Sequence, residues 1–412
     1  MKKKVWIINH YAGGMLFKNG GRHYWFSKYL KKDGYEPVVF CCNAKHGKEE
    51  FFIETDRLWV EKKAENIDVP FVFVKSTTYS NNGKARIMNM IRFYSNVRKA
   101  MKEYAKIHGK PDVILASSVH PLSLVAGIKL AKYFGIKCIC EVRDLWPLSL
   151  VAFDIIDEKS ALCKLLYQGE KWIYAHADQL VFTFKNGAQY IKDRGWEKSI
   201  DLKKVHYINN GIDLDGYDNK RSDYAFHDKD LESEKVKIIY TGSMGPPNQI
   251  NLIIDAAKKL QDSSVGNVKF ILFGDGISRN AEEQRCINSG IDNVIFKGTV
   301  EKEKIPYILS KSDATVLIEK NTPLNRYGIS ENKVFDYLAA GKPILCNDAS
   351  IRSIVDESDC AIVDNDLANA VKVLLQMDPE DYRKACSSSE IVAHAYDFES
   401  LTDTLESIIE MA

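Results

Sequence analysis

The sequence predicts an α/β protein made of two doubly wound, Rossmann-like domains that face each other across a cleft. Three observations support this prediction. The chain has 412 residues, 45% of them hydrophobic, which suits two cores of roughly 200 residues each. Short β-branched runs alternate with longer amphipathic stretches, as in parallel sheets covered by helices on both faces. Between residues 214 and 234 this alternation stops, and it then starts again.

The alternation divides the chain into four segments. We expect an N-terminal domain at 1–212, a linker rich in Asp, Lys and Ser at 213–234, and a C-terminal domain at 235–395. We also expect a C-terminal helix at 396–412 that packs back on the N-terminal domain. The strands predicted for the first domain are Lys4–His10, Glu36–Cys42, Val69–Val74, Asp112–Ser117, Lys137–Val142 and Gln179–Thr183. Those predicted for the second are Val236–Tyr240, Val268–Phe273, Val294–Phe296, Ala314–Ile318, Pro343–Cys346 and Cys360–Val363.

Composition excludes several classes of protein. No apolar run approaches the roughly 20 residues that span a bilayer, and the basic opening precedes a run too short for a secretory signal. The nine cysteines contain no Cys-x-x-Cys pair, and the nine histidines show no metal-ligand spacing. We therefore expect reduced thiols, a cytoplasmic protein, and neither an essential metal nor another cofactor.

The two halves of the chain carry opposite charge. Residues 1–212 hold 35 Lys and Arg against 21 Asp and Glu, a net charge of +14. Residues 213–412 hold 22 against 35, a net charge of −13. The overall charge of +1 argues against a general nucleic-acid binder, whereas the basic half suits an anionic surface.

Glycine-rich loops follow strands in both predicted domains. Such a loop lets backbone approach a ligand, and the following helix start presents free N–H groups to anions. An ordinary turn is the alternative for each loop. The candidate residues are Gly20 and Gly21 in the first domain and Gly242, Ser243, Gly274, Asp275, Gly276 and Arg279 in the second.

Two further candidates follow strands of the first domain. His120 comes just after the strand that ends at Ser117, and Arg143 and Asp144 follow the next strand. Ligands of doubly wound sheets bind at this carboxyl edge. A structural histidine and a buried Arg–Asp pair are the alternatives.

The stretch from Arg326 to Pro343 is the most informative. Lys333, Asp336 and Tyr337 lie at i, i+3 and i+4 of a predicted helix, so we expect them to share a face. A lysine in the first helical turn opposes the helix dipole, which favours a role for Lys333 in binding an anion.

These stretches together resemble glycosyltransferase family 4, the retaining enzymes of the GT-B fold. The resemblance covers nearly the whole chain and is strongest to the bacterial O-antigen and capsule branch, which includes N-acetylfucosamine transferases. The motifs that carry it are Asn19-Gly-Gly-Arg, Val142-Arg-Asp-Leu-Trp-Pro, Asn210-Gly-Ile-Asp, Tyr240-Thr-Gly-Ser, Phe273-Gly-Asp-Gly, Phe296-Lys-Gly-Thr-Val and Asn332-Lys-Val-Phe-Asp-Tyr-Leu-Ala-Ala-Gly-Lys-Pro.

The resemblance implies that the two domains bind different substrates. The C-terminal domain would hold the nucleotide, with Asp336 on the ribose and Lys333 on the diphosphate. The loops Gly274–Gly276 and Phe296–Val300 would border the base. The first domain would bind the acceptor, with His120 touching the transferred sugar. The remaining implied residues are Gly20 and Gly21 at the diphosphate, Arg143 and Asp144 with His120 in catalysis, and Thr299, Val300, Arg326, Ser330, Glu331 and Asn332 around the donor.

Three positions depart from the family pattern. Gly328 stands where the family has the first glutamate of a pair, so either Ser330 or Glu331 takes its contact with the sugar or no residue does. Ser243 and the Asn248-Gln249 region replace an Arg and a Lys, which leaves Lys333, Arg279, Arg326 and helix N-termini to balance the diphosphate charge. Glu331 replaces a proline.

The resemblance implies a metal-free transfer of sugar from a nucleotide-sugar donor, most simply a UDP-sugar, to a lipid-linked or glycan acceptor with retained configuration. Two alternatives remain open: a nucleotide-sugar 2-epimerase on the same fold, and a non-catalytic scaffold that binds sugar nucleotides. Residues 84–110 add a basic amphipathic helix, with eight Lys and Arg against Glu103. This helix predicts peripheral docking of the N-terminal domain on the anionic inner face of the cell membrane, with an ordinary packed surface helix as the alternative.

Overall fold

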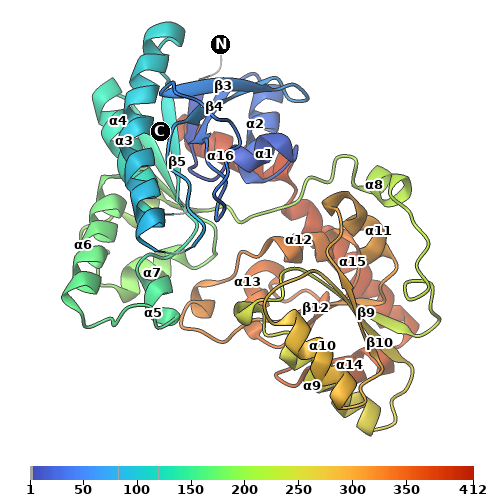
Figure 1. Cartoon of the computed structure of the whole chain (residues 1–412). Coiled ribbons are helices and arrows are strands. Elements are labelled where there is room, and N and C mark those ends of the chain that lie inside the picture. Colours follow the sequence, from blue (N-terminus) through green and yellow to red (C-terminus); the bar gives the residue numbers. More distant parts are fainter. Residues whose placement is uncertain (1–2, 82, 119) are drawn as a thin grey trace. The chain divides into compact units, whose positions relative to one another are not determined.

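The computed structural model describes residues 3–81, 83–118 and 120–412 (Figure 1). The chain folds into two compact units. Unit 1 comprises Met1–Asn209 and Phe398–Ala412, and unit 2 comprises Asn210–Asp397. The boundary expected after residue 212 therefore falls three residues earlier, and the last helix belongs to unit 1.

Unit 1 is built on an eight-stranded sheet in the order β3-β4-β2-β1-β5-β6-β7-β8. Its strands are β1 (Lys4–Ile8), β2 (Glu36–Cys42), β3 (Trp59–Ala64), β4 (Val69–Val74), β5 (Val113–Ser117), β6 (Lys137–Val142), β7 (Gln179–Phe182) and β8 (Val205–Tyr207). Its helices are α1 (Gly13–Phe17), α2 (Arg22–Lys32), α3 (Lys84–His108), α4 (Pro121–Phe134), α5 (Leu148–Ala152), α6 (Ala161–His176), α7 (Gly187–Asp193) and α16 (Phe398–Met411).

The sequence did not predict β3 and β8. β3 pairs antiparallel with β4 at the edge of the sheet, and its central residues, Glu61, Lys62 and Lys63, are exposed. Charged residues on an edge strand discourage pairing with other chains, and they also hide the apolar alternation of a strand. β8 has only three residues, all half-buried, and is too short to show a pattern.

The C-terminal helix α16 packs against α2 in unit 1. Phe398 meets Phe26 edge to ring, with 5.4 Å between centroids. Lys3 donates through Nζ to the Ile409 carbonyl at 2.7 Å, and the Tyr35 hydroxyl donates to Glu410 at 2.9 Å. The end of the chain is thus part of the unit 1 core.

Unit 2 is a parallel six-stranded sheet in the order β11-β10-β9-β12-β13-β14. Helices from two separate apolar clusters cover its two faces. The strands are β9 (Val236–Thr241), β10 (Val268–Phe273), β11 (Val294–Gly298), β12 (Ala314–Leu317), β13 (Ile344–Cys346) and β14 (Ala361–Val363). The helices are α8 (Tyr217–Asp223), α9 (Asn251–Asp262), α10 (Arg279–Asn288), α11 (Ile305–Ser310), α12 (Asn332–Ala339), α13 (Arg352–Val355), α14 (Leu367–Gln376) and α15 (Pro379–Ala395).

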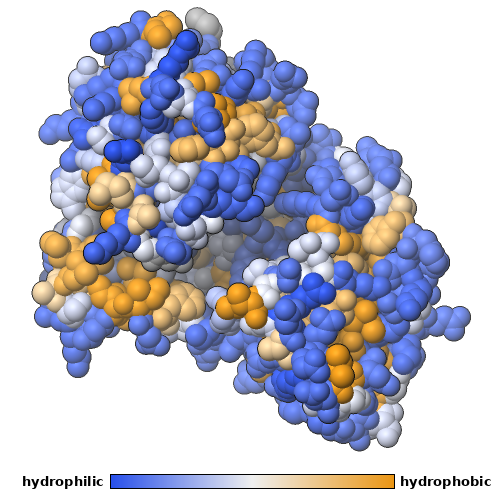
Figure 2. Space-filling model, viewed as in Figure 1, coloured by the Kyte–Doolittle hydropathy of each residue, from blue (hydrophilic) through white to orange (hydrophobic). Residues whose placement is uncertain are grey.

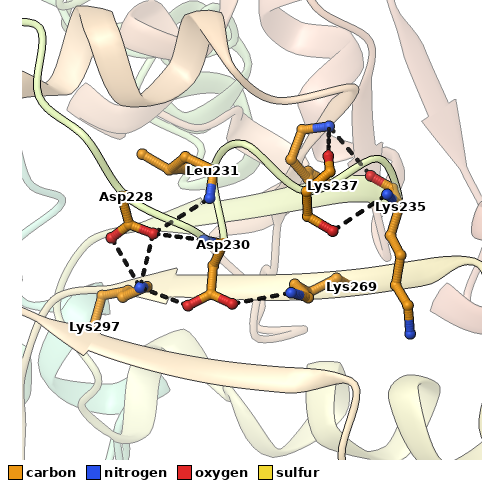
Figure 3. Close-up of polar contacts among 8 residues, drawn as sticks. Asp228, Asp230, Leu231, Lys235, Lys237, Lys269 and Lys297 are labelled. Carbon is orange, nitrogen blue, oxygen red and sulfur yellow. Dashed lines mark hydrogen bonds and ion pairs between the residues drawn. The ribbon is translucent and has the colours of Figure 1, made fainter.

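The segment 213–234, expected as a linker, is a folded part of unit 2. Tyr217 and Leu231 are buried in the core. Figure 3 shows how acidic side chains fasten the segment to the sheet: Asp228 and Asp230 both pair with Lys297 of β11, and Asp230 also pairs with Lys269 of β10. The composition of the segment suggested a linker because two buried apolar side chains and several ion pairs, rather than an aliphatic stretch, attach it to the sheet.

We expect Asp230→Asn to lower the unfolding free energy of unit 2 by about 1–2 kcal/mol at pH 7, because Lys269 loses its carboxylate. Burial alone would raise the pKa of Asp230, but Lys297 and Lys269 lower it below the usual range. Asp230 therefore stabilises the fold at pH values above its pKa in the unfolded chain, and this stabilisation is lost as the pH falls through its lower pKa in the folded protein. The difference in unfolding free energy between wild type and Asp230→Asn should vanish well below about pH 4.

Calorimetry can follow this change in unit 2, while tryptophan fluorescence serves as an internal control because all six tryptophans lie in unit 1. The matched variant is Asp262→Asn, which removes an exposed i,i+4 partner of Lys258 and should cost less than about 0.5 kcal/mol. Equal effects of the two variants would show that the Asp230 pairs do not anchor the segment.

Candidate functional site

Both sheets reverse their strand order next to their first strand. In unit 1 the reversal lies between β1 and β5, and in unit 2 it lies between β9 and β12. In open α/β sheets, ligands bind outside the carboxyl ends of the strands at such a point. The loops after these four strands are therefore the places to look for function.

In unit 2, polar side chains meet at the reversal around Lys333. Its ammonium lies 2.5 Å from Asn248 Oδ1 and 2.9 Å from Glu331 Oε2, and it sits over the Tyr240 ring at 5.0 Å from the centroid. Asn248 in turn donates to Ser243 Oγ at 3.1 Å. These five residues, Tyr240, Ser243, Asn248, Glu331 and Lys333, are called the Lys333 site below.

The start of α12 fixes the position of Lys333. Val334, Phe335 and Leu338 are buried in the core, so the helix cannot rotate. Lys333 lies in the first turn, where the helix dipole repels a cation and attracts an anion. An anionic ligand at this point would be favoured by both the ammonium and the dipole.

Asp336 and Tyr337 lie close to Lys333 along α12 but have other partners. The Tyr337 hydroxyl accepts from the Thr241 amide at 2.9 Å, which ties α12 to the end of β9. Burial raises the pKa of the Asp336 carboxyl, and the charges that oppose this effect come from Lys302 and Lys220. The three residues were expected to share one face of the helix. Lys333 and Tyr337 do turn toward β9, but the charges that act on Asp336 lie elsewhere.

The glycines after β9 and β10 allow two loops to pack backbone on backbone. A Cβ on Gly274 would lie 1.8 Å from the Gly242 carbonyl oxygen, and one on Gly276 would lie 2.5 Å from the carbonyl carbon of Met244. Gly242 and Gly274 also have φ of 150° and 139°. These positions therefore need glycine for loop packing, whether or not a ligand approaches.

The loops after β10 and β11 meet at Arg279. Its guanidinium lies 3.9 Å from Asp275 and 3.7 Å from Glu283, and a Cβ on Gly298 would come within 3.3 Å of it. Asp275 and Thr299 are exposed, and Val300 is half-buried against the core. The structure thus brings the loop of Asp275 and the turn at Thr299, both implied as borders of the base, close to Arg279, which the resemblance implied as a charge partner of the diphosphate.

Gly328 has φ of 102°, a region that favours glycine. The absence of the family glutamate at this position therefore coincides with a different local backbone. Nearby, Arg326 donates to the Tyr327 hydroxyl, the Ser330 carbonyl accepts from Asn210, and Asn332 at the start of α12 is exposed. The Ser330 hydroxyl is buried and has no hydrogen-bond partner among the described residues.

Sequence reasoning missed Glu319. It follows β12, is 7% exposed, and its Oε1 has no hydrogen-bond partner within the described part of the chain. The available signal was an acid directly after the apolar run Ala314–Ile318. Burial, together with the charges of Glu331 and Asp348, raises the pKa of Glu319 to about 8.

In unit 1 the glycine loop leads into a buried ion-pair network. Gly21 precedes α2 with φ of 112°. Arg22, predicted as part of a phosphate-facing motif, is buried instead and donates to Glu141 at 2.7 Å and to the Ile208 carbonyl at 2.9 Å. His23 lies 3.1 Å from the other Glu141 oxygen. Burial alone would raise the pKa of Glu141, but Arg22 and His23 hold it well below its usual range.

His120 is 1% exposed and is the N-cap residue that precedes α4. Its Nε2 lies 2.6 Å from His10 Nδ1, and His10 stacks on Phe93. Burial lowers the pKa of His120 to about 3, with Arg86 acting in the same direction, so the imidazole is neutral at pH 7. The Nδ1 atom of His120 is buried and has no hydrogen-bond partner among the described residues.

The His10–His120 pair adjoins an aromatic cluster that the sequence did not reveal. Tyr11 stacks on His46 at 4.3 Å, and the Tyr79 hydroxyl lies 2.9 Å from His46 Nδ1 and 3.1 Å from the Tyr11 hydroxyl. These residues follow β1, β2 and β4, and together with His120 after β5 they occupy the same sheet edge. Val119, next to His120, lies outside the described residues.

Arg143 and Asp144 do not form the buried pair that was the alternative, since Asp144 is exposed and Arg143 half-buried. Asp144 and Trp146 line a small cavity together with Glu170. Glu170 accepts from the Tyr174 and Tyr190 hydroxyls at 2.7 and 2.6 Å, and burial raises its pKa to about 8.

Within residues 3–81, 83–118 and 120–412, no helix has the length and apolar character needed to cross a membrane. In the same ranges, no group of three or more His, Cys, Asp and Glu side chains is placed to hold a metal ion.

Comparison with known proteins assigns both units. The family model described as Glycosyltransferase Family 4 matches residues 24–215, and the model described as Glycosyl transferases group 1 matches residues 235–377. The two domains are those of a glycosyltransferase. The probable glycosyltransferase WbjE of Pseudomonas aeruginosa is 24% identical over 254 residues, which is 60% of each chain. The putative teichuronic acid biosynthesis glycosyltransferase TuaH of Bacillus subtilis (strain 168) is 25% identical over 158 residues, 36% of this chain and 37% of TuaH.

Solved structures support the same fold. Sucrose-phosphate synthase from Thermosynechococcus elongatus superposes with a TM-score of 0.72 at 15% identity, covering 100% of this chain and 99% of that one. Anabaena HepE in complex with UDP gives 0.67 at 13% identity, covering 99% and 100%. The chain has the GT-B fold, as the sequence predicted.

Within these glycosyltransferase domains, we expect His120→Ala to lower turnover by about 100-fold while nucleotide affinity changes less than about twofold. The reason is that His120 lies in unit 1, whereas the Lys333 site lies in unit 2. Asp144→Asn should likewise lower turnover while leaving nucleotide affinity nearly unchanged. Product formation and equilibrium binding of UDP would be measured side by side, with His176→Ala, an exposed histidine of α6, as the control. Wild-type turnover in His120→Ala would make this histidine structural.

Proposed function

We propose that the chain is a retaining glycosyltransferase that moves a sugar from a UDP-sugar to a membrane-linked glycan acceptor. The observation that carries the proposal is the Lys333 site, a cation at the strand-order reversal of a domain that matches the Glycosyl transferases group 1 model. HepE, which shares the fold, has been solved with UDP and with UDP-glucose. That likeness favours UDP as the donor nucleotide.

Cleavage of the bond between the sugar and the diphosphate leaves negative charge on the leaving phosphate. In the proposed mechanism, Lys333 exchanges Glu331 and Asn248 for a diphosphate oxygen, and the start of α12 adds its dipole. Arg279 and Arg326 are the other cations of unit 2 that we assign to donor binding. Because these groups are already in place, they can stabilise the charge as it forms.

Retention would follow if the acceptor hydroxyl attacks from the same face as the departing diphosphate. A leaving phosphate oxygen then takes the hydroxyl proton, so no side chain has to act as a base. His120 fits this scheme as a neutral imidazole that hydrogen-bonds the sugar through Nδ1. Gly20 and Gly21 would approach the diphosphate by their backbone, and Arg143 and Asp144 would contact the reacting sugars.

The names of the relatives suggest the biological context: WbjE is a probable glycosyltransferase and TuaH a putative teichuronic acid biosynthesis glycosyltransferase. Together with the resemblance to the O-antigen and capsule branch, they favour a role in bacterial surface polysaccharide synthesis and a hexose or N-acetylaminosugar as the transferred unit.

Two linked measurements test the proposal. A thermal-shift panel of UDP- and GDP-sugars should show stabilisation by one UDP-sugar, because a ligand stabilises the native state according to its occupancy. That sugar, radiolabelled, should then pass into the lipid fraction of bacterial membranes in the presence of EDTA, and the product should keep the anomeric configuration. Loss of transfer with EDTA and recovery with magnesium would contradict the metal-free mechanism, and inversion would contradict front-face attack.

The helix predicted to meet the membrane is α3, and only part of its apolar stripe is buried. Met90, Val97 and Met101 pack into unit 1, whereas Ile87 is 58% and Ile91 47% exposed. Met88 beside them is 54% exposed. We propose that this outer strip, flanked by the exposed cations Lys84, Arg92 and Lys99, lies on an anionic membrane.

A second apolar set lies on unit 1 around α5 and the start of α6. Phe153, Ile155, Leu162 and Leu165 are all more than 40% exposed, and Figure 2 shows apolar residues gathered there. α3, α4 and α6 are neighbouring helices, and each begins at the carboxyl edge of the sheet. Both apolar sets are therefore near the edge assigned to the acceptor, which suits an acceptor held in a membrane.

Reversing Lys84, Arg92 and Lys99 to Glu should weaken binding to anionic vesicles by about 100-fold or more, since each basic group contributes about 1 kcal/mol near the surface. Co-sedimentation over a salt series measures this, and wild-type binding should fall as salt rises. The control reverses three exposed lysines of unit 2, Lys229, Lys258 and Lys384. Equal retention on neutral vesicles, or none on either, would leave α3 as an ordinary surface helix.

A further inference from the structure

Glu319 lies beside the Lys333 site and has no assigned role. Its backbone is held from both sides by Asn347, which follows β13: the Glu319 amide donates to Asn347 Oδ1 at 2.7 Å, and Asn347 Nδ2 donates to the Glu319 carbonyl at 2.9 Å. The side chain therefore starts from a fixed point between the carboxyl ends of β12 and β13. It is directed into the protein rather than into solvent, as its 7% exposure shows.

Several titratable groups face this carboxyl from the elements around it. They are Tyr240 on β9, Cys346 and Asp348 at the end of β13, and Glu331 and Lys333 at the start of α12. Burial raises the pKa of Tyr240 above its usual value and that of Cys346 to about 12. Neither group therefore changes charge between pH 7.5 and 9.

A buried carboxyl whose oxygen lacks a hydrogen-bond partner is costly, so its presence calls for a compensating ligand. An ionised Glu319 would add a third carboxylate beside Glu331 and Asp348 and would repel an anion. A protonated Glu319 has an O–H group to donate and adds no negative charge beside Lys333. Only the second form is compatible with a diphosphate at this place.

We propose that Glu319 is a donor-binding residue whose protonated carboxyl donates a hydrogen bond to the diphosphate oxygen held by Lys333. This inference rests on the proposed function and deepens it. At pH 7 the carboxyl already carries its proton, because its pKa is raised to about 8. Above pH 8 the nucleotide can bind only if Glu319 takes up one proton from solvent, so affinity becomes linked to pH.

The test is calorimetric titration of the full-length protein with UDP between pH 7.5 and 9.0, with GDP as the second probe. A terminal phosphate, with a second pKa of about 6, is ionised throughout this range. Wild-type affinity should fall by about eightfold from pH 7.5 to 9.0, as expected for a required proton on a group with a pKa of about 8. Buffers of different ionisation enthalpy should show proton uptake that approaches one at pH 9.

Glu319→Gln replaces the O–H donor by a permanent N–H donor. Its affinity at pH 7.5 should stay within about threefold of wild type, and its pH dependence should disappear. Glu331→Gln removes a neighbouring negative charge, so the pKa of Glu319 should fall and the loss of affinity should begin at a lower pH. The matched control is Glu170→Gln, because Glu170 in unit 1 is equally buried with a pKa of about 8 and should leave the pH dependence unchanged.

A pH-independent wild-type affinity, or the same pH dependence in Glu319→Gln as in wild type, would overturn the inference while leaving the proposed function intact. Failure of wild-type protein to bind UDP or GDP at pH 7.5 is a different result, because it would overturn the proposed function and this inference with it.

Discussion

Lys333→Met should weaken UDP binding by about 10- to 100-fold and lower turnover by a further 100-fold or more. The first loss is that of a charged hydrogen bond, worth about 1.5–3 kcal/mol. The second arises because the ammonium stabilises charge that appears on the leaving phosphate only in the transition state. Calorimetry with UDP and release of UDP from the donor would measure the two effects separately.

The control for this variant is Lys258→Met, an exposed lysine of α9 that pairs with Asp262 and should leave both quantities unchanged. The fold should survive the Lys333 change, because the ammonium contacts Glu331, Asn248 and the Tyr240 hydroxyl, and the methionine side chain can still pack on the Tyr240 ring. If Lys333→Met binds UDP as tightly as wild type, the donor does not bind at the Lys333 site.

Glu141→Gln should lower the unfolding free energy of unit 1 by about 3–5 kcal/mol, because it leaves the buried Arg22 guanidinium without its counter-charge. Urea unfolding followed by tryptophan fluorescence reports this change selectively, since all six tryptophans lie in unit 1. Unit 2 should unfold at its wild-type midpoint when it is followed by calorimetry.

The pair variant Arg22→Met with Glu141→Leu distinguishes a lost charge partner from general disruption. Removing both charges avoids an unpaired buried ion, so this variant should be more stable than Glu141→Gln alone. If the pair variant is the less stable of the two, packing around Glu141 rather than charge dominates the effect.

The sequence predicted the two sheets well because their strands are buried on both faces and appear as apolar runs. The sequence analysis missed or misassigned elements that are rich in polar residues. One is the edge strand β3, and the other is the segment 213–234, in which Asp228 and Asp230 form ion pairs with lysines of the sheet. Ion pairs between distant residues leave no periodic trace in a sequence. For the same reason, the sequence did not show that Arg22 is buried against Glu141, because these two residues are 119 positions apart.

For the candidate site, the sequence indicated loops rather than contacts. It singled out Lys333 from its unfavourable place in a helix dipole, and the structure adds the partners Asn248, Glu331 and Tyr240. Glu319 and the cluster of Tyr11, His46 and Tyr79 escaped because each follows a different strand. Only the sheet topology brings such residues to one edge.

The most direct test of the central claim is a crystal structure of the full-length protein with UDP. We expect the diphosphate within hydrogen-bonding distance of Lys333 Nζ and near Arg279, the base beside the Gly274–Gly276 loop and the turn at Thr299, and Glu331 released from Lys333. UDP bound elsewhere, with Lys333 still held by Glu331 and Asn248, would contradict the assignment of the Lys333 site as the donor site.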